Sequence, residues 1–153
     1  MKKLVFLFSL FLVFVSCSLD DEGALDELNK NRRLWQSYQI KDYTWNQHIS
    51  CFCAGPRERD VFVVNLIKDS VAFDETGFDP EYIEEIREIV FNSSHTIEDA
   101  FNLADDLLNR EVAFLEIEYD KIYGFPTLIS VDYVENIADD EITHIYTNFE
   151  IMN

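Results

Sequence analysis

Basic residues are scarce in this sequence, where 12 lysines and arginines stand against 30 aspartates and glutamates, for a formal net charge of −18. Phosphate backbones and anionic lipid head groups repel such a chain. We therefore exclude nucleic acid as a partner. Only three prolines occur, all after position 55, and we find no internal repeat and no low-complexity tract, which excludes repeat and low-complexity architectures.

No hydrophobic run is long enough to span a bilayer stably, which takes about 20 apolar residues. The longest run, Leu4–Val15, follows a basic start, and Cys17 and the acidic triplet Asp20–Glu22 come after it in place of basic stop-transfer residues. A basic start followed by a short apolar run is typical of an export signal. The sequence therefore predicts a signal peptide over residues 1–16.

The four residues before Cys17, Val13–Ser16, resemble a bacterial lipobox with a small residue at the cleavage position. We expect Cys17 to carry an acyl anchor that holds the chain on a lipid bilayer without spanning it. The alternative is an ordinary secretory signal. The triplet Asp20–Glu22 resembles the surface-export signal of bacterial lipoproteins, and a solvated linker is its alternative. We predict that the protein is located at the outer membrane. If the triplet acts as an export signal, the protein lies on the outer face of that membrane.

Removal of the signal would leave 137 of the 153 residues and, without Lys2 and Lys3, a net charge of about −20, which suits one domain. We assign residues 17–33 to a lipidated linker with the start of the first helix, and residues 34–153 to a single globular domain. A hydrophobic content of 48% and an aromatic content of 14% are too high for a disordered acidic tail. The negative charge therefore belongs to the surface of a folded domain.

Hydrophobic periodicity predicts helices and strands that are segregated along the chain. The predicted strands cover residues 43–53, 61–67, 71–73, 112–119, 127–134 and 142–149, with Lys68 and Asp69 as the turn after the second strand. The predicted helices cover residues 24–39, a segment with Asp79 as its N-cap and Pro80 as its first residue, and a segment that a capping box of Thr96 and Asp99 opens. This order favours an α+β fold, an antiparallel sheet of about five to six strands with two to three helices packed on one face.

Two short motifs carry a family resemblance: a Cys-Phe-Cys triplet at 51–53 after a strand that begins with tyrosine, and a Tyr-Asp…Gly-Phe-Pro turn at 119–126. With them, the chain resembles a domain-of-unknown-function family, numbered 6174, of secreted bacterial proteins and lipoproteins. The resemblance covers about Leu34–Phe149 and brings no activity with it. The segment Asp74–Ser94 is longer than expected for the family. Further matching residues are Trp35, Ile40, Asp42, Tyr43, Thr96, Ile97, Phe101, Ile129, Asp132 and the segment 136–141.

Cys51 and Cys53 continue the period-two pattern at the end of the first predicted strand, in alternation with Ser50 and Phe52. We expect them on its buried face, with Tyr43, Trp45 and Ile49. An exported compartment favours a disulfide between them, although Cα atoms two apart in a regular strand lie about 6.6 Å from each other, near the upper end of disulfide geometry. Three interpretations stay open: a structural bridge or two buried thiols, a strained bond with a redox role, and a soft-metal site.

Oxygen ligands concentrate in one loop near the C-terminus, at Asp132, Glu135, Asp139, Asp140 and Glu141. Such residues suit a hard cation such as calcium. The loop lacks the regular spacing and the glycine of an EF-hand, and a solvated acidic turn is the alternative interpretation. We expect no cofactor.

No catalytic motif stands out, because His48, His95 and His144 are scattered and no nucleophile has a recognisable context. The aromatic residues of the predicted strands have two interpretations: they line a ligand groove, or they form core and cross-strand pairs. These residues are Tyr43, Trp45, Tyr119, Tyr123, Phe125 and Tyr133. Our leading hypothesis is a non-enzymatic, membrane-anchored binding or structural module of the cell envelope, whose partner is an envelope protein or ligand. The alternative is a thiol-redox or metal-handling lipoprotein that works through Cys51 and Cys53.

Overall fold

The computed structural model describes residues 20–53 and 55–152. Its helices are α1 (Asp20–Ser37), α2 (Ile83–Ser93) and α3 (Ile97–Leu108). Its strands are β1 (Tyr43–Ser50), β2 (Glu58–Val64), β3 (Ile67–Ala72), β4 (Phe114–Tyr119), β5 (Pro126–Asp132) and β6 (Ile142–Ile151). These elements form an α+β fold, which confirms the predicted fold class.

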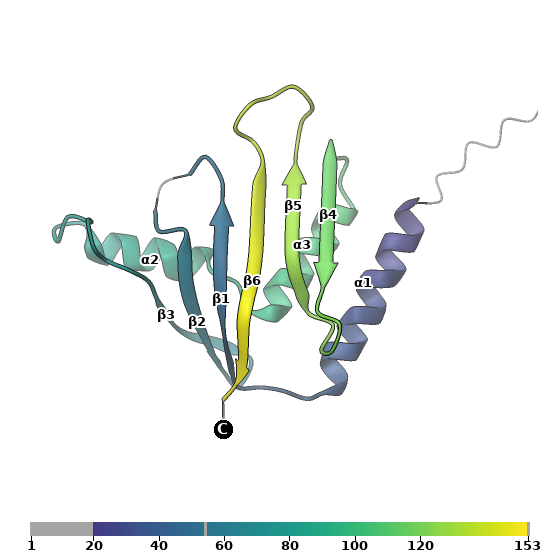
Figure 1. Ribbon diagram of the computed structural model, residues 1–153, viewed down its shortest axis with the longest axis horizontal. Helices are drawn as coiled ribbons and strands as arrows, with labels where there is room; N and C mark the ends of the chain where they lie inside the picture. The colour runs from purple at the N-terminus through teal and green to yellow at the C-terminus, as the bar shows by residue number, and fades with distance from the viewer. Residues whose placement is uncertain (1–19, 54, 153) are drawn as a thin grey trace, which may run out of the picture.

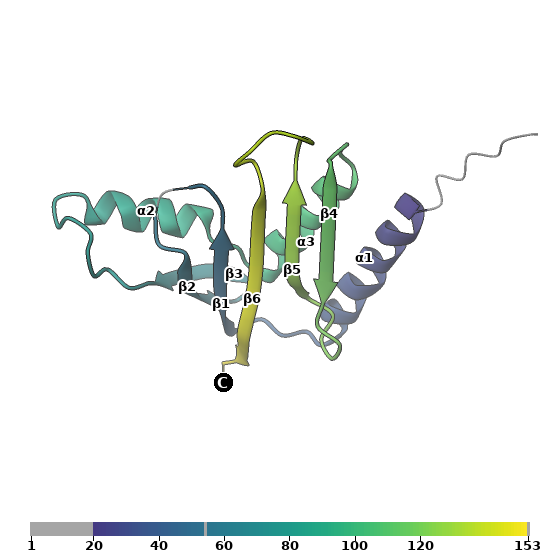
Figure 2. The ribbon, with the colours of Figure 1, turned by 45° about the horizontal axis from the view of Figure 1, so that its top comes forward.

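The six strands form one antiparallel sheet in the order β3-β2-β1-β6-β5-β4. Two meanders, β1-β2-β3 and β4-β5-β6, meet where the first strand pairs with the last, from Tyr43 opposite Ile151 to Ser50 opposite Thr143. All three helices lie behind the sheet in Figure 1, with α2 behind the β3 end and α1 beyond β4. Figure 2 shows the same one-sided layering from a second angle.

Alternation along β1 sets the core, because every second side chain, from Tyr43 to Ile49, is buried beneath the helices. The helix α3 supplies the opposing surface and begins with the predicted capping box. The hydroxyl of Thr96 accepts from the Asp99 backbone N–H at 3.1 Å, and the Asp99 carboxylate accepts from the Thr96 N–H at 2.9 Å. This cap orients a helix whose buried residues are Ile97, Ala100, Phe101, Ala104 and Leu107.

The predicted turn at Lys68 and Asp69 is wrong. The β2–β3 hairpin turns instead at Asn65 and Leu66, whose φ angles of 51° and 67° are those of a two-residue hairpin turn that matches strand twist. The turn is held from outside, because the Asn65 N–H donates to the Asp42 carboxylate at 2.7 Å and the Leu66 N–H donates to the Lys41 carbonyl at 2.9 Å. Tertiary contacts thus override the apolar pattern that runs through the turn.

The predicted start of the second helix is also wrong. The Asp79 carboxylate accepts from the Glu81 N–H at 2.9 Å, and the Asp79 carbonyl accepts from the Tyr82 N–H at 3.0 Å, so Asp79 closes a separate turn. The helix α2 begins at Ile83, after Tyr82, which makes no side-chain cap.

A bulge in β6 changes which side chains face the helices. Asn148 has a φ of 52°, and the pairing of β1 with β6 shifts register between Thr44 and Asn46. Tyr146 and Phe149, three positions apart, therefore both reach the helix-covered side, where each contacts an aromatic ring of the core. Strict alternation would have put them on opposite faces.

The other face of the sheet carries polar side chains, as an antiparallel sheet with one solvated face does. His48 pairs with Glu58 at 2.7 Å, and the hydroxyls of Ser130 and Thr143 lie 2.9 Å apart. In the part of the chain that the structure describes, no helix has both the length and the apolar character needed to cross a membrane.

Candidate functional site

The two cysteines lie beyond β1, which ends at Ser50, so their predicted place on its buried face is wrong. Cys51 is half-buried and Cys53 is exposed. Their Cα atoms are 5.2 Å apart and their sulfur atoms are in bonding contact, closer than a regular strand would hold them. Phe52 between them is 82% exposed. The pair is a candidate disulfide in a loop open to solvent.

In the acidic loop near the C-terminus, one carboxylate accepts a hydrogen bond from the loop's own backbone, and two residues adopt left-handed backbone angles. The Asp140 carboxylate accepts from the Val134 N–H at 3.0 Å, and Asn136 and Asp139 adopt positive φ angles of 66° and 72°. Burial, with the carboxylates of Asp140 and Glu141, raises the pKa of Asp132. Within residues 20–53 and 55–152, no three His, Cys, Asp or Glu side chains converge as a metal site would require.

The strand aromatics with the deepest burial form core. Trp45 stacks on Tyr146 with ring centroids 4.4 Å apart, and Trp35 meets Tyr43 and Phe125 edge to face at 5.7 and 5.9 Å. Tyr43, Trp45 and Phe125 are each at most 3% exposed. These rings fill the interior, and Trp35 and Tyr43 also line a surface hollow of about 570 Å³ with Gln36, Gln39, Ile40, Lys41, Leu66, Thr96 and Glu98.

The Tyr-Asp…Gly-Phe-Pro motif is a structural turn between β4 and β5. The Asp120 carboxylate accepts from the N–H groups of Ile122 and Tyr123 at 2.9 and 2.6 Å. Gly124 has a φ of 83°, and a Cβ there would lie 2.7 Å from the Asn31 carbonyl of α1. The turn therefore docks the sheet against α1 and sends Phe125 into the core.

The structure brings together a buried polar cluster that the sequence did not indicate, made of Gln47, His95, His144 and Tyr146. The Gln47 amide oxygen accepts from the His95 backbone N–H at 3.0 Å, which orients the amide so that its nitrogen donates to His95 Nδ1 at 3.3 Å. The Tyr146 hydroxyl lies 2.8 Å from the same nitrogen. Because Nδ1 receives these donors, His95 is held neutral, with its proton on Nε2.

Burial dominates the electrostatics of this cluster. Desolvation lowers the pKa of His95 to about 4 and that of His144 to about 3. The two imidazole rings are 5.0 Å apart, and Nδ1 of His144 is buried without a hydrogen-bond partner in the described residues. Charge on either ring is therefore disfavoured at neutral pH. The readable signals were a glutamine at an inward position of β1 and the pair His144 and Tyr146 on one face of β6.

Arg59 lies beside this cluster and is 6% exposed. Its guanidinium donates to the Ser93 hydroxyl at 2.8 Å and to the Pro56 carbonyl at 2.7 Å. Desolvation lowers the pKa of Arg59. The side chain lines a pocket of about 200 Å³ between α2 and the β1–β2 connection, hereafter the Arg59 pocket, together with Gly55, Pro56, Phe78, Ile86, Ile89, Val90 and Ser93.

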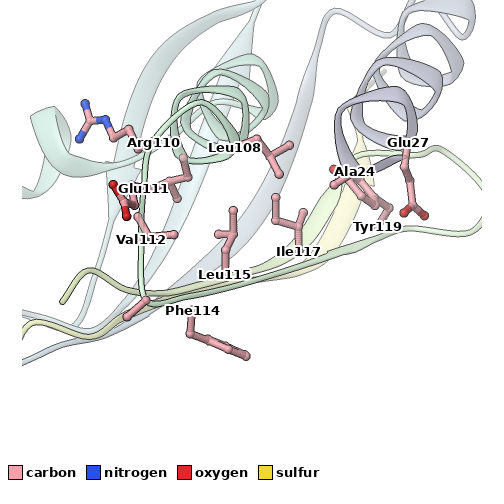
Figure 3. Close-up of a pocket in the computed structure, with 12 residues that line it drawn as sticks. Ala24, Glu27, Leu108, Arg110, Glu111, Val112, Phe114, Leu115, Ile117 and Tyr119 are labelled. Atoms are coloured by element: carbon pink, nitrogen blue, oxygen red, sulfur yellow. The ribbon is translucent and has the colours of Figure 1, made fainter. Parts of the chain in front are cut away.

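A larger hollow of about 460 Å³, hereafter the β4 groove, lies beneath β4 between α1 and the end of α3. Figure 3 shows Leu115 and Ile117 pointing into it from the strand, with Leu108 opposite and Phe114 on the other side of the sheet. Acidic side chains stand at its two ends, Glu27 from α1 and Glu111 from the α3–β4 connection. The floor is apolar, and the rim carries these two glutamates together with Arg110 beside Glu111.

The fold and these cavities define a class of small α+β domains with a one-sided, six-stranded antiparallel sheet. The chain belongs to a family of unknown function, DUF6174, whose profile matches residues 27–151, which confirms the resemblance seen in the sequence. No curated protein and no solved structure shows significant similarity to it. The predicted signal peptide and the predicted lipidation site Cys17 lie outside the described residues, and Asp20–Glu22 forms the first turn of α1.

Proposed function

We propose that the protein is a non-enzymatic binding module of the bacterial cell envelope, anchored to a lipid bilayer through an acyl group on Cys17. Its partner is an extended segment of an envelope protein that adds to the sheet along β4. The observation that carries this proposal is an open strand edge directly above an apolar groove.

β4 is the last strand of the sheet, and within the described residues it pairs with β5 alone. The outer edge of such a strand presents backbone N–H and C=O groups that another chain can pair with. Strand addition draws affinity from these main-chain hydrogen bonds and specificity from the alternate side chains of the added segment.

The side chains of β4 define the chemistry of that segment. Leu115 and Ile117 face the β4 groove, and Glu116 and Glu118 are exposed on the helix-free face. A matching segment carries apolar residues toward the groove and basic residues toward the two glutamates. A net charge of −18 disfavours a second copy of this chain and attracts a basic partner.

The position of the groove agrees with the proposed anchor. Ala24 and Glu27 line it from the first two turns of α1, and Ala24 follows Cys17 by seven residues in the sequence. A chain held at Cys17 therefore carries the groove close to the membrane, where the chain of another envelope protein is within reach.

A short peptide of alternating lysine and valine tests the binding proposal, with the matching glutamate–valine peptide as its control. We expect only the lysine peptide to bind, and to shift the amide resonances of β4 in an NMR titration. Charge reversal at Glu116→Lys and Glu118→Lys should weaken that binding at least tenfold, whereas Asp69→Lys on β3, the other edge strand, should not. Equal binding of both peptides to the wild type would refute the proposal.

Fractionation of cells tests the anchor. We expect the wild-type protein in the membrane fraction and the Cys17→Ala variant either released or stalled as precursor. A processed Cys17→Ala protein that still fractionates with membranes would contradict lipidation. Protease treatment of intact cells separates the outer face, where the protein is cleaved, from the inner face, where it is protected.

One observation favours a second candidate function, thiol-redox or metal handling through Cys51 and Cys53. Cys53 is exposed in a loop instead of buried in a strand, and exposed sulfurs are accessible to exchange partners. In exchange, a partner dithiol would cleave the Cys51–Cys53 bond, give it two electrons and become oxidised itself. The double variant Cys51→Ser and Cys53→Ser would then lose activity or metal with its fold intact, whereas the binding module keeps its peptide affinity.

A further inference from the structure

The buried arginine of this protein, Arg59, has no carboxylate partner. Three of the more accessible arginines, at positions 32, 87 and 110, each lie within 4.0 Å of an aspartate or glutamate. Arg59 is 6% exposed, and across residues 20–53 and 55–152 no carboxylate oxygen lies within 4.0 Å of it. The chain has 30 acidic residues, yet none of the described ones supplies a counter-charge to this buried guanidinium.

The charge of Arg59 is only partly satisfied. Its two protein acceptors, the Ser93 hydroxyl and the Pro56 carbonyl, are neutral, and its Nε–H is buried with no acceptor among the described residues. Buried charges are costly unless a partner of opposite charge compensates them. Lys68, half-buried on β3, brings a second positive charge to this region, because its Nζ donates to the Ser94 carbonyl and lies 4.8 Å from the centroid of the Phe91 ring of α2. Burial lowers the pKa of Lys68, Asp99 raises it and Arg59 lowers it. Two cationic side chains therefore lie close to α2, with Asp99 as the carboxylate that acts on Lys68.

The pocket beside this guanidinium has the dimensions of a small molecule. Its volume of about 200 Å³ equals about seven water molecules at roughly 30 Å³ each. Phe78, Ile86 and Val90 contribute to an apolar lining, and Ile89, which also lines the pocket, has 54% of its surface exposed. The loop that contributes Phe78 is fixed to α2 by Arg87, which binds Glu75 at 2.7 Å.

We propose that the Arg59 pocket binds a small apolar monocarboxylate. The carboxylate would pair with the guanidinium, whose planar donors match it in a bidentate geometry, and would replace the missing counter-charge. A short branched or aromatic hydrocarbon body would lie against Phe78 and Ile86. Inorganic phosphate fits this pocket less well, because Ser93 is the one hydroxyl on an otherwise apolar wall.

This site is independent of the β4 groove, from which it is separated by the width of the sheet: α2 lies behind the β3 end and β4 forms the opposite edge (Figure 1). A carboxylate with the required chemistry is either a free acid or the C-terminus of a peptide. Both present the same group to Arg59, and the two sources are separated by the probes below.

The test is an NMR titration with 4-methylpentanoate, in which the Arg59 Nε–H resonance reports the contact directly. We expect saturable shifts of that resonance and of the amides of Ile86 and Ser93. The neutral isostere 4-methylpentan-1-ol should bind at least tenfold more weakly. A tripeptide that ends in leucine separates the two sources: tighter binding than the free acid assigns the site to a chain terminus, and weaker binding assigns it to a free acid.

Arg59→Met should abolish binding. If Arg59 is needed for folding, two variants of Ile89 still test the proposal. Ile89→Glu, at the exposed rim, should place a carboxylate beside Arg59 and weaken 4-methylpentanoate at least tenfold, whereas Ile89→Gln of the same shape should keep binding within twofold. If the alcohol binds as well as the acid, or if the two Ile89 variants behave alike, the Arg59 pocket is not a carboxylate site.

Discussion

The layer beneath the helices has two halves of different character. Toward β5 and α1, aromatic rings pack on one another, with Trp35 in edge-to-face contact with Tyr43 and Phe125. Toward β2 and α2, the buried side chains include the polar Gln47 and Arg59 beside valines at positions 61, 63 and 90. Within the described residues, Arg59 Nε and His144 Nδ1 of the second half are buried without a hydrogen-bond partner, and so are Arg32 Nε on α1 and Asp132 Oδ1 at the end of β5. The difference between the halves is therefore the aromatic packing of the first half and the buried polar side chains of the second.

This difference separates stability from ligand recognition. Aromatic rings bury large apolar areas and gain further from their geometry, so the first half supplies most of the folding energy. Buried polar groups without partners lower stability, and groups with perturbed pKa values concentrate at functional sites. We therefore expect the aromatic half to respond to substitution mainly in stability, and the polar half mainly in binding and pH dependence.

The largest effect is expected in the aromatic half. Phe125→Ala removes a ring that is 3% exposed and contacts four neighbouring aromatic rings within about 6.2 Å. The lost burial and the cavity should lower the free energy of unfolding by about 4 kcal/mol, as measured by chemical denaturation. The control is Phe114→Ala, whose ring is 51% exposed on β4 and should cost less than about 1 kcal/mol. Similar costs would contradict the division between core and surface rings.

The docking of the sheet against α1 should be nearly as sensitive. Gly124→Ala places a Cβ 2.7 Å from the Asn31 carbonyl and forces alanine to a φ of 83°, so we expect a loss of about 3 kcal/mol. Gly77→Ala is the matched control, since it shares a positive φ of 91° but its Cβ meets no described atom within 4 Å. It should cost about 1 kcal/mol. Thermal unfolding of the two variants measures the difference. If both lose the same unfolding free energy, the clash with α1 is ruled out.

Much of the stable half follows from local patterns in the sequence. The alternation along β1 and the capping box of Thr96 and Asp99 predicted both elements, because each depends on residues a few positions apart. The turn at Asn65 and Leu66 was not predictable in the same way. It depends on hydrogen bonds to Asp42 and Lys41, which are distant in sequence, and an apolar residue at a positive φ gives no turn signal.

The polar half was less predictable for the same reason. Gln47, His95 and Tyr146 come from β1, the α2–α3 connection and β6, so no local spacing links them. Arg59 occupies an inward position between Val61 and the end of the β1–β2 connection, and its burial depends on how α2 packs. The predicted position of the cysteines was wrong for a different reason. The alternating pattern continues past Ser50 in the sequence, but the strand ends at Ser50.

The polar half should make stability depend on pH. His95 and His144 have folded-state pKa values of about 4 and about 3, below the ordinary value of about 6.5. As pH falls below 6.5, the unfolded chain takes up these protons before the folded one does, so stability declines toward pH 4. The charged neighbours are Arg59, Lys68 and Asp99, of which Asp99 partly opposes the decline for His95. We expect each of the two histidines to contribute a loss of about 2 kcal/mol between pH 7 and pH 5.

Urea denaturation at a series of pH values measures this loss. Because many carboxylates titrate in the same range, the informative quantity is the difference between variants. His144→Leu should reduce the decline by about half, or about 2 kcal/mol. Thr147→Leu, an exposed neighbour on β6, should leave the wild-type slope unchanged. Parallel curves for wild type and His144→Leu would mean that His144 titrates alike in the folded and unfolded states.

The smallest effect is expected at Cys51 and Cys53, in the loop that leads from β1 to the Arg59 pocket. We predict that they are joined in the mature protein, since their Cα separation of 5.2 Å lies within the disulfide range and an exported compartment is oxidising. A disulfide that closes so short a loop removes little entropy from the unfolded chain. The double serine variant should therefore lose less than about 2 kcal/mol of unfolding free energy, below the roughly 3 kcal/mol expected for a 15-residue loop. Mass spectrometry of the alkylated, non-reduced protein should find this peptide lighter by two hydrogens and unlabelled. Complete alkylation without reduction would show free thiols, and labelling that appeared only after chelation would instead indicate a bound metal.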